Sequence, residues 1–334
     1  GWSIFGIIWT MAILGIVFNS IDLKKYLSTK VQIKGNDDKG KIIINYYSKT
    51  DLERIKYHLE KIKKPTITTG VGGSSVVSTY ASKVLSNKNG IIAQHQEPRD
   101  MLYKNLKGYE NVIACSYGGK NYGVKTSFDN DLNKYLLSSN PSELEEITNL
   151  TYDTTINKEN SFISLGATLI PMSIMLAYYN DNDIEIIKEI LTTAKEYNID
   201  FSTIYEILTG YDTNTASTYL ESTLTESGIA IPVVHDKYSY CHGRSTLSYS
   251  NDSSLIHLDT KQELDELYKE ELPAYYKEII TLDRKYDDDI INDFYLTYQA
   301  MLLSKAIAEN KERDLSRVNY SPVVKKLYYY KGKM

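Results

Sequence analysis

Hydrophobic residues recur with a helical period and a strand period in turn along most of the chain. In residues 48–64, the apolar residues Leu52, Ile55, Leu59 and Ile62 are three or four positions apart, which predicts an amphipathic helix. A short run rich in β-branched residues follows at 65–69 and predicts a strand. The alternation continues to residue 309, so the pattern predicts an α/β protein.

The predicted elements fall into two similar rounds. The first has strands at 65–69, 90–94, 112–116 and 134–138, and helices at 48–64, 74–86, 98–106, from 141, and at 161–179. The second has strands at 203–209, 229–234, 254–258 and 278–282, and helices at 184–197, 216–227, 261–271 and 294–309. Strands that alternate with helices form parallel βαβ units. We therefore expect two doubly wound parallel-sheet lobes, at residues 45–182 and 183–334, after a polar, turn-rich linker at 22–44.

The first 21 residues differ from the rest because they carry no charged side chain and contain both tryptophans, Trp2 and Trp9. Since a helix of about 20 apolar residues can cross a bilayer, we expect a hydrophobic helix here. It would be a membrane span or a remnant of a fused membrane protein, with a buried core helix as the alternative. The run GWSIFGIIWTMAILGI resembles one span of the hemolysin III family. Lysines that follow this segment favour a cytoplasmic body that it could tether to a membrane.

Two predicted strands end in loops that suit an anion, and ligands of open α/β sheets bind beyond the carboxyl ends of strands. The first loop, GVGGSS at residues 70–75, has glycines that allow a close backbone approach and N–H groups at a helix start. Its predicted binding residues are Gly72, Gly73, Ser74 and Ser75. A tight turn capped by serine is the structural alternative. The spacing matches neither a dinucleotide fingerprint nor a P-loop, which argues against a nucleotide-dependent dehydrogenase.

The second loop, CSYGGKN at residues 115–121, follows a later strand. It combines a hydroxyl, two glycines, a positive charge and an amide, which together are able to surround a phosphate group. The predicted binding residues are Ser116, Gly118, Gly119, Lys120 and Asn121.

Composition and charge limit the partners and cofactors. A net charge of -5 gives no general attraction to nucleic acid. Cys115 and Cys241 form no paired motif, and the five histidines show no metal-ligand spacing. We expect no metal, no cofactor and a reducing compartment.

Taken together, the two loops resemble the sugar isomerase (SIS) family, and the resemblance extends over about residues 45–320. It rests on Gly72-Gly73-Ser74 after one strand and on Ser116 and Gly119 after another. The family's second loop usually reads Ser-x-Ser-Gly-x-Thr and holds a sugar phosphate. Gly118 and Asn121 stand where that pattern has serine and threonine. The resemblance implies two SIS lobes and a sugar-phosphate ligand.

The spacing of Glu226 and the run His242-Gly243-Arg244 resembles the isomerase domain of glucosamine-6-phosphate synthase. There, a helix glutamate moves a proton between C1 and C2 of the sugar, and a histidine helps to open the ring. The resemblance implies these catalytic roles for Glu226 and His242, and a substrate contact for Arg244. Arg244 and Thr223 replace the proline and the helix lysine of that enzyme. The structural alternative is a surface glutamate and a histidine bonded to a strand end.

The C-terminal run ERDLSR at residues 312–317 resembles the SIS tail that folds over the sugar site. Arg313 and Leu315 match it, and Arg317 keeps a positive charge for substrate binding. Members of the family are commonly dimers in which the neighbouring subunit lends the histidine, which implies a homodimer.

Two functions remain open from the sequence. The first is an aldose–ketose or amino-sugar phosphate isomerase or deaminase, which the spacing of Glu226 and His242 favours. The second is a non-catalytic sugar-phosphate sensor or regulatory module, which the altered second loop and the missing helix lysine favour.

Overall fold

The computed structural model describes residues 30–35, 40–45, 49–119, 121–139, 147–152, 162–181, 184–250, 252–317 and 321–324. The hydrophobic helix predicted at 1–21, the predicted binding residue Lys120 and the start of the helix predicted from 141 lie outside the described residues. No helix in the described ranges is long and apolar enough to cross a membrane.

An antiparallel hairpin precedes the lobes, in the segment predicted as a linker. It consists of β1 (Lys30–Gly35) and β2 (Gly40–Asn45), and Gly35 pairs with Gly40 at its closed end. The turn residues of this segment were predicted from the sequence, but its two strands were not.

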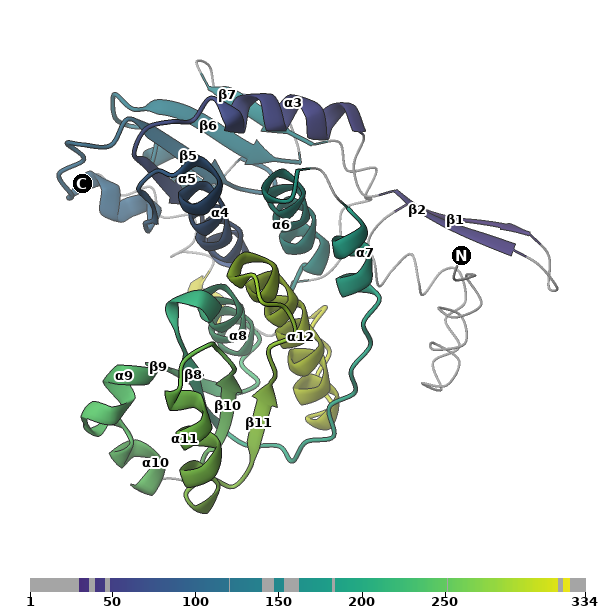
Figure 1. Cartoon of the computed structure of the whole chain (residues 1–334), viewed down its shortest axis with the longest axis vertical. Helices are drawn as coiled ribbons and strands as arrows, with labels where there is room; N and C mark the ends of the chain where they lie inside the picture. The colour runs from purple at the N-terminus through teal and green to yellow at the C-terminus, as the bar shows by residue number, and fades with distance from the viewer. Residues whose placement is uncertain are drawn as a thin grey trace.

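The first lobe is built on a five-stranded parallel sheet in the order β4-β3-β5-β6-β7 (Figure 1). Its strands are β3 (Thr66–Thr69), β4 (Ala93–His95), β5 (Asn111–Cys115), β6 (Asn133–Ser138) and β7 (Thr148–Thr151). Its helices are α3 (Lys49–Glu60), α4 (Gly73–Asn89), the 3-10 turn η1 (Pro98–Leu102), α5 (Tyr122–Thr126) and α6 (Leu165–Tyr179). All strand predictions for this lobe are confirmed to within a few residues, and β7 was not predicted.

The second lobe repeats the plan with a four-stranded parallel sheet in the order β11-β10-β8-β9. Its strands are β8 (Ile204–Thr209), β9 (Ile231–Asp236), β10 (Ser254–Leu258) and β11 (Ile279–Leu282). Its main helices are α7 (Glu185–Leu191), α8 (Asn214–Glu226), α11 (Leu264–Glu271) and α12 (Asp289–Asn310). Short helical turns complete it: η2 (Tyr211–Thr213), α9 (Lys237–Ser239), η3 (Tyr240–Arg244), α10 (Thr246–Ser250) and η4 (Leu272–Ala274). The turns between 237 and 250 were not predicted.

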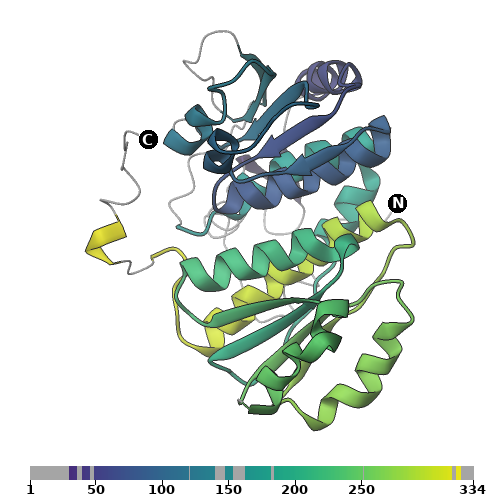
Figure 2. The same cartoon turned by 90° about the vertical axis from the view of Figure 1, so that its left-hand side faces the viewer.

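Helices α4 and α6 of the first lobe pack against α8 and α12 of the second, as Figures 1 and 2 show from two sides. One hydrophobic core cluster runs through both lobes. Polar contacts add to it: the Tyr80 hydroxyl donates to the Ile290 carbonyl at 3.0 Å, and buried Lys83 pairs with buried Asp293. The predicted fold class of two doubly wound parallel-sheet lobes is therefore confirmed.

Candidate active site

The two predicted binding loops lie side by side at one edge of the first sheet. Strands β3 and β5 are hydrogen-bonded neighbours, with Thr69 opposite Ala114, so the loops that follow them leave the same edge. The Val71 side chain lies 3.6 Å from the point where a Cβ on Gly123 would be. The first loop therefore contacts the short helix that follows the second.

The first loop requires its glycines. A Cβ on Gly70 would lie 2.3 Å from the Ser74 carbonyl oxygen, and Gly72 has φ 58° and ψ -132°, a conformation that side chains rarely adopt. The Ser75 hydroxyl is used within the loop, where it donates to the Gly72 carbonyl at 2.6 Å. Among the described residues, the Ser74 hydroxyl has no hydrogen-bond partner. Ser74, at the start of the 17-residue helix α4, is thus the serine of this loop that is available to a ligand.

The second loop is less open to a ligand than its composition suggested. The Asn121 side chain caps α5 by accepting a hydrogen bond from the Gly123 N–H at 2.8 Å. The Ser116 hydroxyl accepts one from the Gly119 N–H at 3.1 Å, which leaves its own proton free to be donated. Around Gly118, a Cβ would meet nothing within 4 Å. Ser116 is therefore the clearest side-chain donor in the described part of this loop.

Glu226, from the second lobe, lies against the first loop. It is the last residue of α8, and its Oε1 is 3.1 Å from the point where a Cβ on Gly72 would be. The structure thus brings together two predicted site residues that are far apart in the sequence. Burial of the carboxyl raises the pKa of Glu226, a hydrogen bond from Ser222 at 2.8 Å opposes this rise, and the charge of Glu221 adds to it. A carboxylate with a raised pKa beside the loop that was predicted to bind an anion suits proton exchange with a ligand.

His242 is not near Glu226 within one chain. Glu226 precedes β9, whereas His242 follows it in the exposed turn η3, together with Arg244. At about 3.3 Å per residue, a six-residue strand spans roughly 17 Å. The two predicted catalytic residues therefore lie at opposite edges of the second sheet.

The predicted tail lies on the side of the first loop. The N–H groups of Phe162 and Ile163, just before α6, donate to the carbonyls of Ser316 and Leu315 at 3.2 and 3.3 Å. Further along α6, Thr168 Oγ1 lies 3.4 Å from the point where a Cβ on Gly73 would be. Arg317 is the last residue of this tail and is exposed.

Gln96 and Ser139, which follow β4 and β6, also lie at this edge, and neither was predicted as a site residue. Buried Ser139 donates to the Tyr117 carbonyl at 2.9 Å, which connects the end of β6 to the second loop. The backbone carbonyl of Gln96 accepts a hydrogen bond from the Thr69 hydroxyl at 2.7 Å. The side-chain Oε1 of Gln96 is buried and has no partner among the described residues. Ser139 directly follows the strand predicted at 134–138, and Gln96 lies two residues after the strand predicted at 90–94. The rule that ligands bind beyond strand ends therefore points to both residues.

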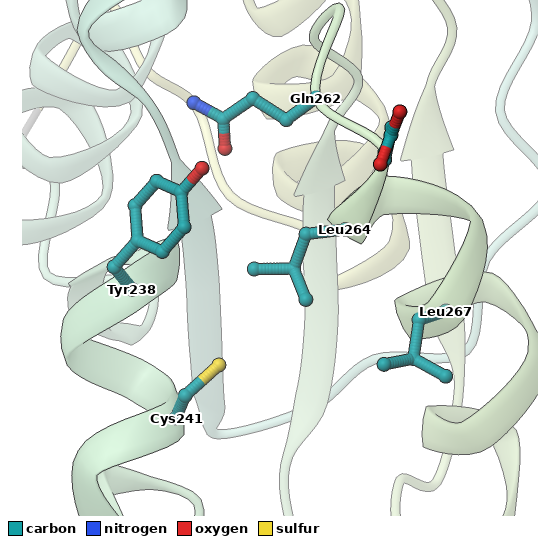
Figure 3. A pocket seen from close by; sticks show the side chains of 6 residues that line it. Tyr238, Cys241, Gln262, Leu264 and Leu267 are labelled. Carbon is teal, nitrogen blue, oxygen red and sulfur yellow. The ribbon is translucent and has the colours of Figure 1, made fainter.

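A hollow of about 610 Å³ lies away from this edge, on the second lobe (Figure 3). Its wall includes Tyr238, Cys241, Gln262 and Leu267. It contains none of the predicted site residues.

Three possible metal ligands, His257, Asp259 and Asp265, also lie close together in the second lobe. Asp265 already bonds to the Lys237 ammonium, to His257 at 3.0 Å and to the Thr260 N–H at 2.8 Å. The Lys237 ammonium therefore already pairs with Asp265, one of the two carboxylates of this cluster.

Comparison with protein-family models gave no match, and comparison with curated protein sequences gave none either. Comparison with solved structures gave several extensive matches. Tagatose-6-phosphate ketose/aldose isomerase from Escherichia coli has a TM-score of 0.63 at 11% identity, and the match covers 82% of this chain and 90% of that one. Glucosamine-6-phosphate deaminase from Thermotoga maritima has a TM-score of 0.58 at 12% identity, with 81% and 95% covered.

A third match concerns the enzyme whose motif the sequence resembles. The C-terminal domain of glucosamine-fructose-6-phosphate aminotransferase from Francisella tularensis has a TM-score of 0.57 at 12% identity, with 81% of this chain and 92% of that domain covered. At such identities the likeness shows the fold, so the chain has the two-lobed SIS fold. The comparisons give no support to the likeness with hemolysin III.

Proposed function

We propose that this chain binds a sugar phosphate at the carboxyl edge of the first sheet and is an aldose–ketose or amino-sugar phosphate isomerase or deaminase. The observation that carries the proposal is the position of the Glu226 carboxylate against Gly72. It places a proton-accepting group beside a loop suited to an anion. The fold shared with sugar-phosphate isomerases and deaminases supports the same conclusion.

Charge repulsion orients the ligand in this proposal. The Glu226 carboxylate at Gly72 repels a phosphate, so the phosphate binds further along the loop, with Ser74 and Ser116 as donors. The sugar carbons then lie toward Glu226. In the isomerase reaction Glu226 takes the proton from the carbon beside the carbonyl while the carbonyl oxygen gains a proton, which gives an enediol. The neighbouring hydroxyl then loses its proton and a proton returns to the former carbonyl carbon. The carbonyl thus moves between C1 and C2 without any external oxidant.

A second copy of the chain completes the proposed site. Because Glu226 and His242 lie at opposite edges of the second sheet, a partner subunit has to lend His242 if it is to reach the sugar bound at Gly72. We therefore propose a homodimer. Arg244 would arrive with His242 from the partner, while Arg317 lies on the tail near α6.

The test is to replace Glu226 by Gln, which keeps the shape but cannot accept the proton. We expect turnover of hexose 6-phosphates to fall by about 10²–10⁴-fold, with ligand affinity almost unchanged. The matched control is Glu221→Gln, an exposed glutamate on the same helix, which should retain activity. Activity that survives Glu226→Gln would rule out this mechanism.

A sensor without turnover is the second candidate, and two observations favour it. Asn121, which stands at the threonine position of the family loop, is engaged in capping α5. Thr223, which stands at the position of the helix lysine, is buried and carries no charge. Tight binding of a hexose phosphate by the wild-type chain, without product, would favour this function over the enzyme.

A further inference from the structure

Gly72 is the residue of the first loop that makes room for Glu226. From the point where its Cβ would be, the Glu226 Oε1 is 3.1 Å away, the Cδ 3.9 Å and the Oε2 4.0 Å. At 3.1 Å, any side chain at position 72 would press on Oε1. Gly73, next in the loop, meets only Thr168 at 3.4 Å. Among the glycines of this loop, the contact with Glu226 is therefore specific to Gly72.

Ser222 forms a hydrogen bond to the same carboxylate oxygen. It lies one helical turn before Glu226 on α8, and its hydroxyl donates to Oε1 at 2.8 Å. No described residue donates to Oε2. One oxygen is thus fixed by the protein and the other is left free to exchange a proton.

We propose that Ser222 and Gly72 are positioning residues that hold the Glu226 carboxylate against the ligand loop, with Oε2 as the oxygen that accepts the proton. Ser222 orients the group by its hydrogen bond, and Gly72 admits it by lacking a side chain. The catalytic consequence rests on the proposed function, but the positioning itself does not.

The charges around Glu226 make this arrangement measurable by titration. Glu221, on the same helix, is the charged neighbour that acts on the Glu226 carboxyl. The facing loop, residues 70–75, has no titratable side chain. A hydrogen bond from a hydroxyl stabilises the ionised form, so the Ser222 bond lowers the pKa of Glu226 from the value that burial would impose.

The experiment is an NMR titration of the full chain with ¹³C-labelled glutamate side-chain carboxyls, in which Glu226→Gln identifies the signal of Glu226. Ser222→Ala should raise its midpoint by about 0.5–1 pH unit, and Ser222→Thr, which keeps the hydroxyl, should restore it. The matched control is Ser227→Ala, because the Ser227 hydroxyl donates to the Thr223 carbonyl and not to Glu226. In the active enzyme, the acidic limb of the kcat/KM profile should move by the same amount.

Gly72→Ala provides the second arm. It should lower the midpoint of Glu226 toward the ordinary value, because the added methyl group pushes the carboxyl out of its desolvated position. Gly90→Ala is the control: Gly90 also has a positive φ, 64°, but its Cβ would meet nothing within 4 Å, so the Glu226 midpoint should stay unchanged.

The proposal is overturned if Ser222→Ala leaves the midpoint where Ser227→Ala leaves it, whether or not the chain turns over a sugar phosphate. A shifted midpoint in a protein without turnover would support the positioning and reject only the enzymatic function. If Gly72→Ala does not fold, the comparison of Ser222→Ala with Ser222→Thr decides alone.

Discussion

The two lobes connect their first three strands in the same way, but different side chains lie at the carboxyl edges of their sheets. In each sheet the first strand, β3 or β8, lies between the next two, β4 and β5 or β9 and β10. Both first strands end in the dipeptide Thr-Gly, at Thr69-Gly70 and Thr209-Gly210. After this shared start, the loop at the first edge presents glycines and serine hydroxyls, whereas charged side chains near the start of the second edge pair with one another.

The first-lobe edge is lined by small residues and hydroxyls. Gly72 and Gly73 have no side chain, and the Ser74 hydroxyl has no partner among the described residues. The charge that approaches it, Glu226, comes from the other lobe. A ligand can therefore approach the backbone without displacing an internal ion pair.

The second-lobe edge is occupied by internal ion pairs. Asp212 folds back over Gly210, with its Oδ1 2.7 Å from the point where a Cβ would be, and it lies 3.8 Å from Arg284. Asp293 accepts from the Ala216 N–H at 3.4 Å near the start of α8 and pairs with Lys83. The same βα geometry thus forms a candidate ligand site only where the donors at the strand ends remain unpaired.

The largest expected effect is on the unfolding free energy, and it tests whether the buried ion pair of the second lobe stabilises the fold. Asp265→Asn removes the partner of the fully buried Lys237 ammonium and should cost about 3–5 kcal/mol of unfolding free energy, since it leaves an unpaired buried charge. Urea unfolding measures this. The control Glu266→Gln, whose carboxyl is exposed and pairs with Lys269, should cost about 1 kcal/mol or less. Equal losses in the two variants would contradict the structural role of Asp265.

The pH dependence of stability sharpens the same comparison. Burial would raise the pKa of Asp265, but hydrogen bonds from His257, Lys237 and Thr260 outweigh it and hold the pKa well below the usual range. The folded-state pKa is thus below the unfolded value of about 4, so this stabilisation is complete above about pH 4 and is lost as the pH falls further. The stability difference between wild type and Asp265→Asn, measured by urea unfolding at several pH values, should shrink below pH 4. A constant difference would show that the ionised carboxylate is not responsible.

The smallest expected effect is on ligand affinity and concerns the loop after β5 in the first lobe. Gly118→Ser places a hydroxyl in a position where a Cβ meets nothing within 4 Å, so it should add a donor without strain. We expect the affinity for a hexose 6-phosphate to rise by about 2–10-fold, the effect of one added hydrogen bond of about 0.5–1.5 kcal/mol. Calorimetric titration measures it, and Gly118→Ala controls for the added carbon. A serine variant that binds no better than the alanine variant would place the phosphate away from Gly118.

The strands were predictable because burial on both faces of a parallel sheet leaves a local signal. Residues 254–258 were predicted as a strand and form β10 with the same bounds. By contrast, the short strand β7 and the turns at 237–250 carry weak local patterns, and contacts with the rest of the fold establish them. For example, the Tyr240 hydroxyl forms a hydrogen bond at 2.8 Å with the hydroxyl of Tyr276, which is distant in the sequence.

The sequence by itself determined the α/β class, the two lobes, and the loops at Gly72 and Ser116 as candidate ligand-binding segments, because each of these leaves a pattern within a few adjacent residues. Only the tertiary structure decided that Glu226 lies against Gly72 while His242 lies at the far edge of the second sheet. It also decided which polar side chains are engaged: the Ser75 hydroxyl and the Asn121 Oδ1 bond within their own turns, whereas the Ser74 hydroxyl has no partner among the described residues. The physical reason is that distance between elements, and competition for each hydrogen bond, are set by packing and not by local sequence.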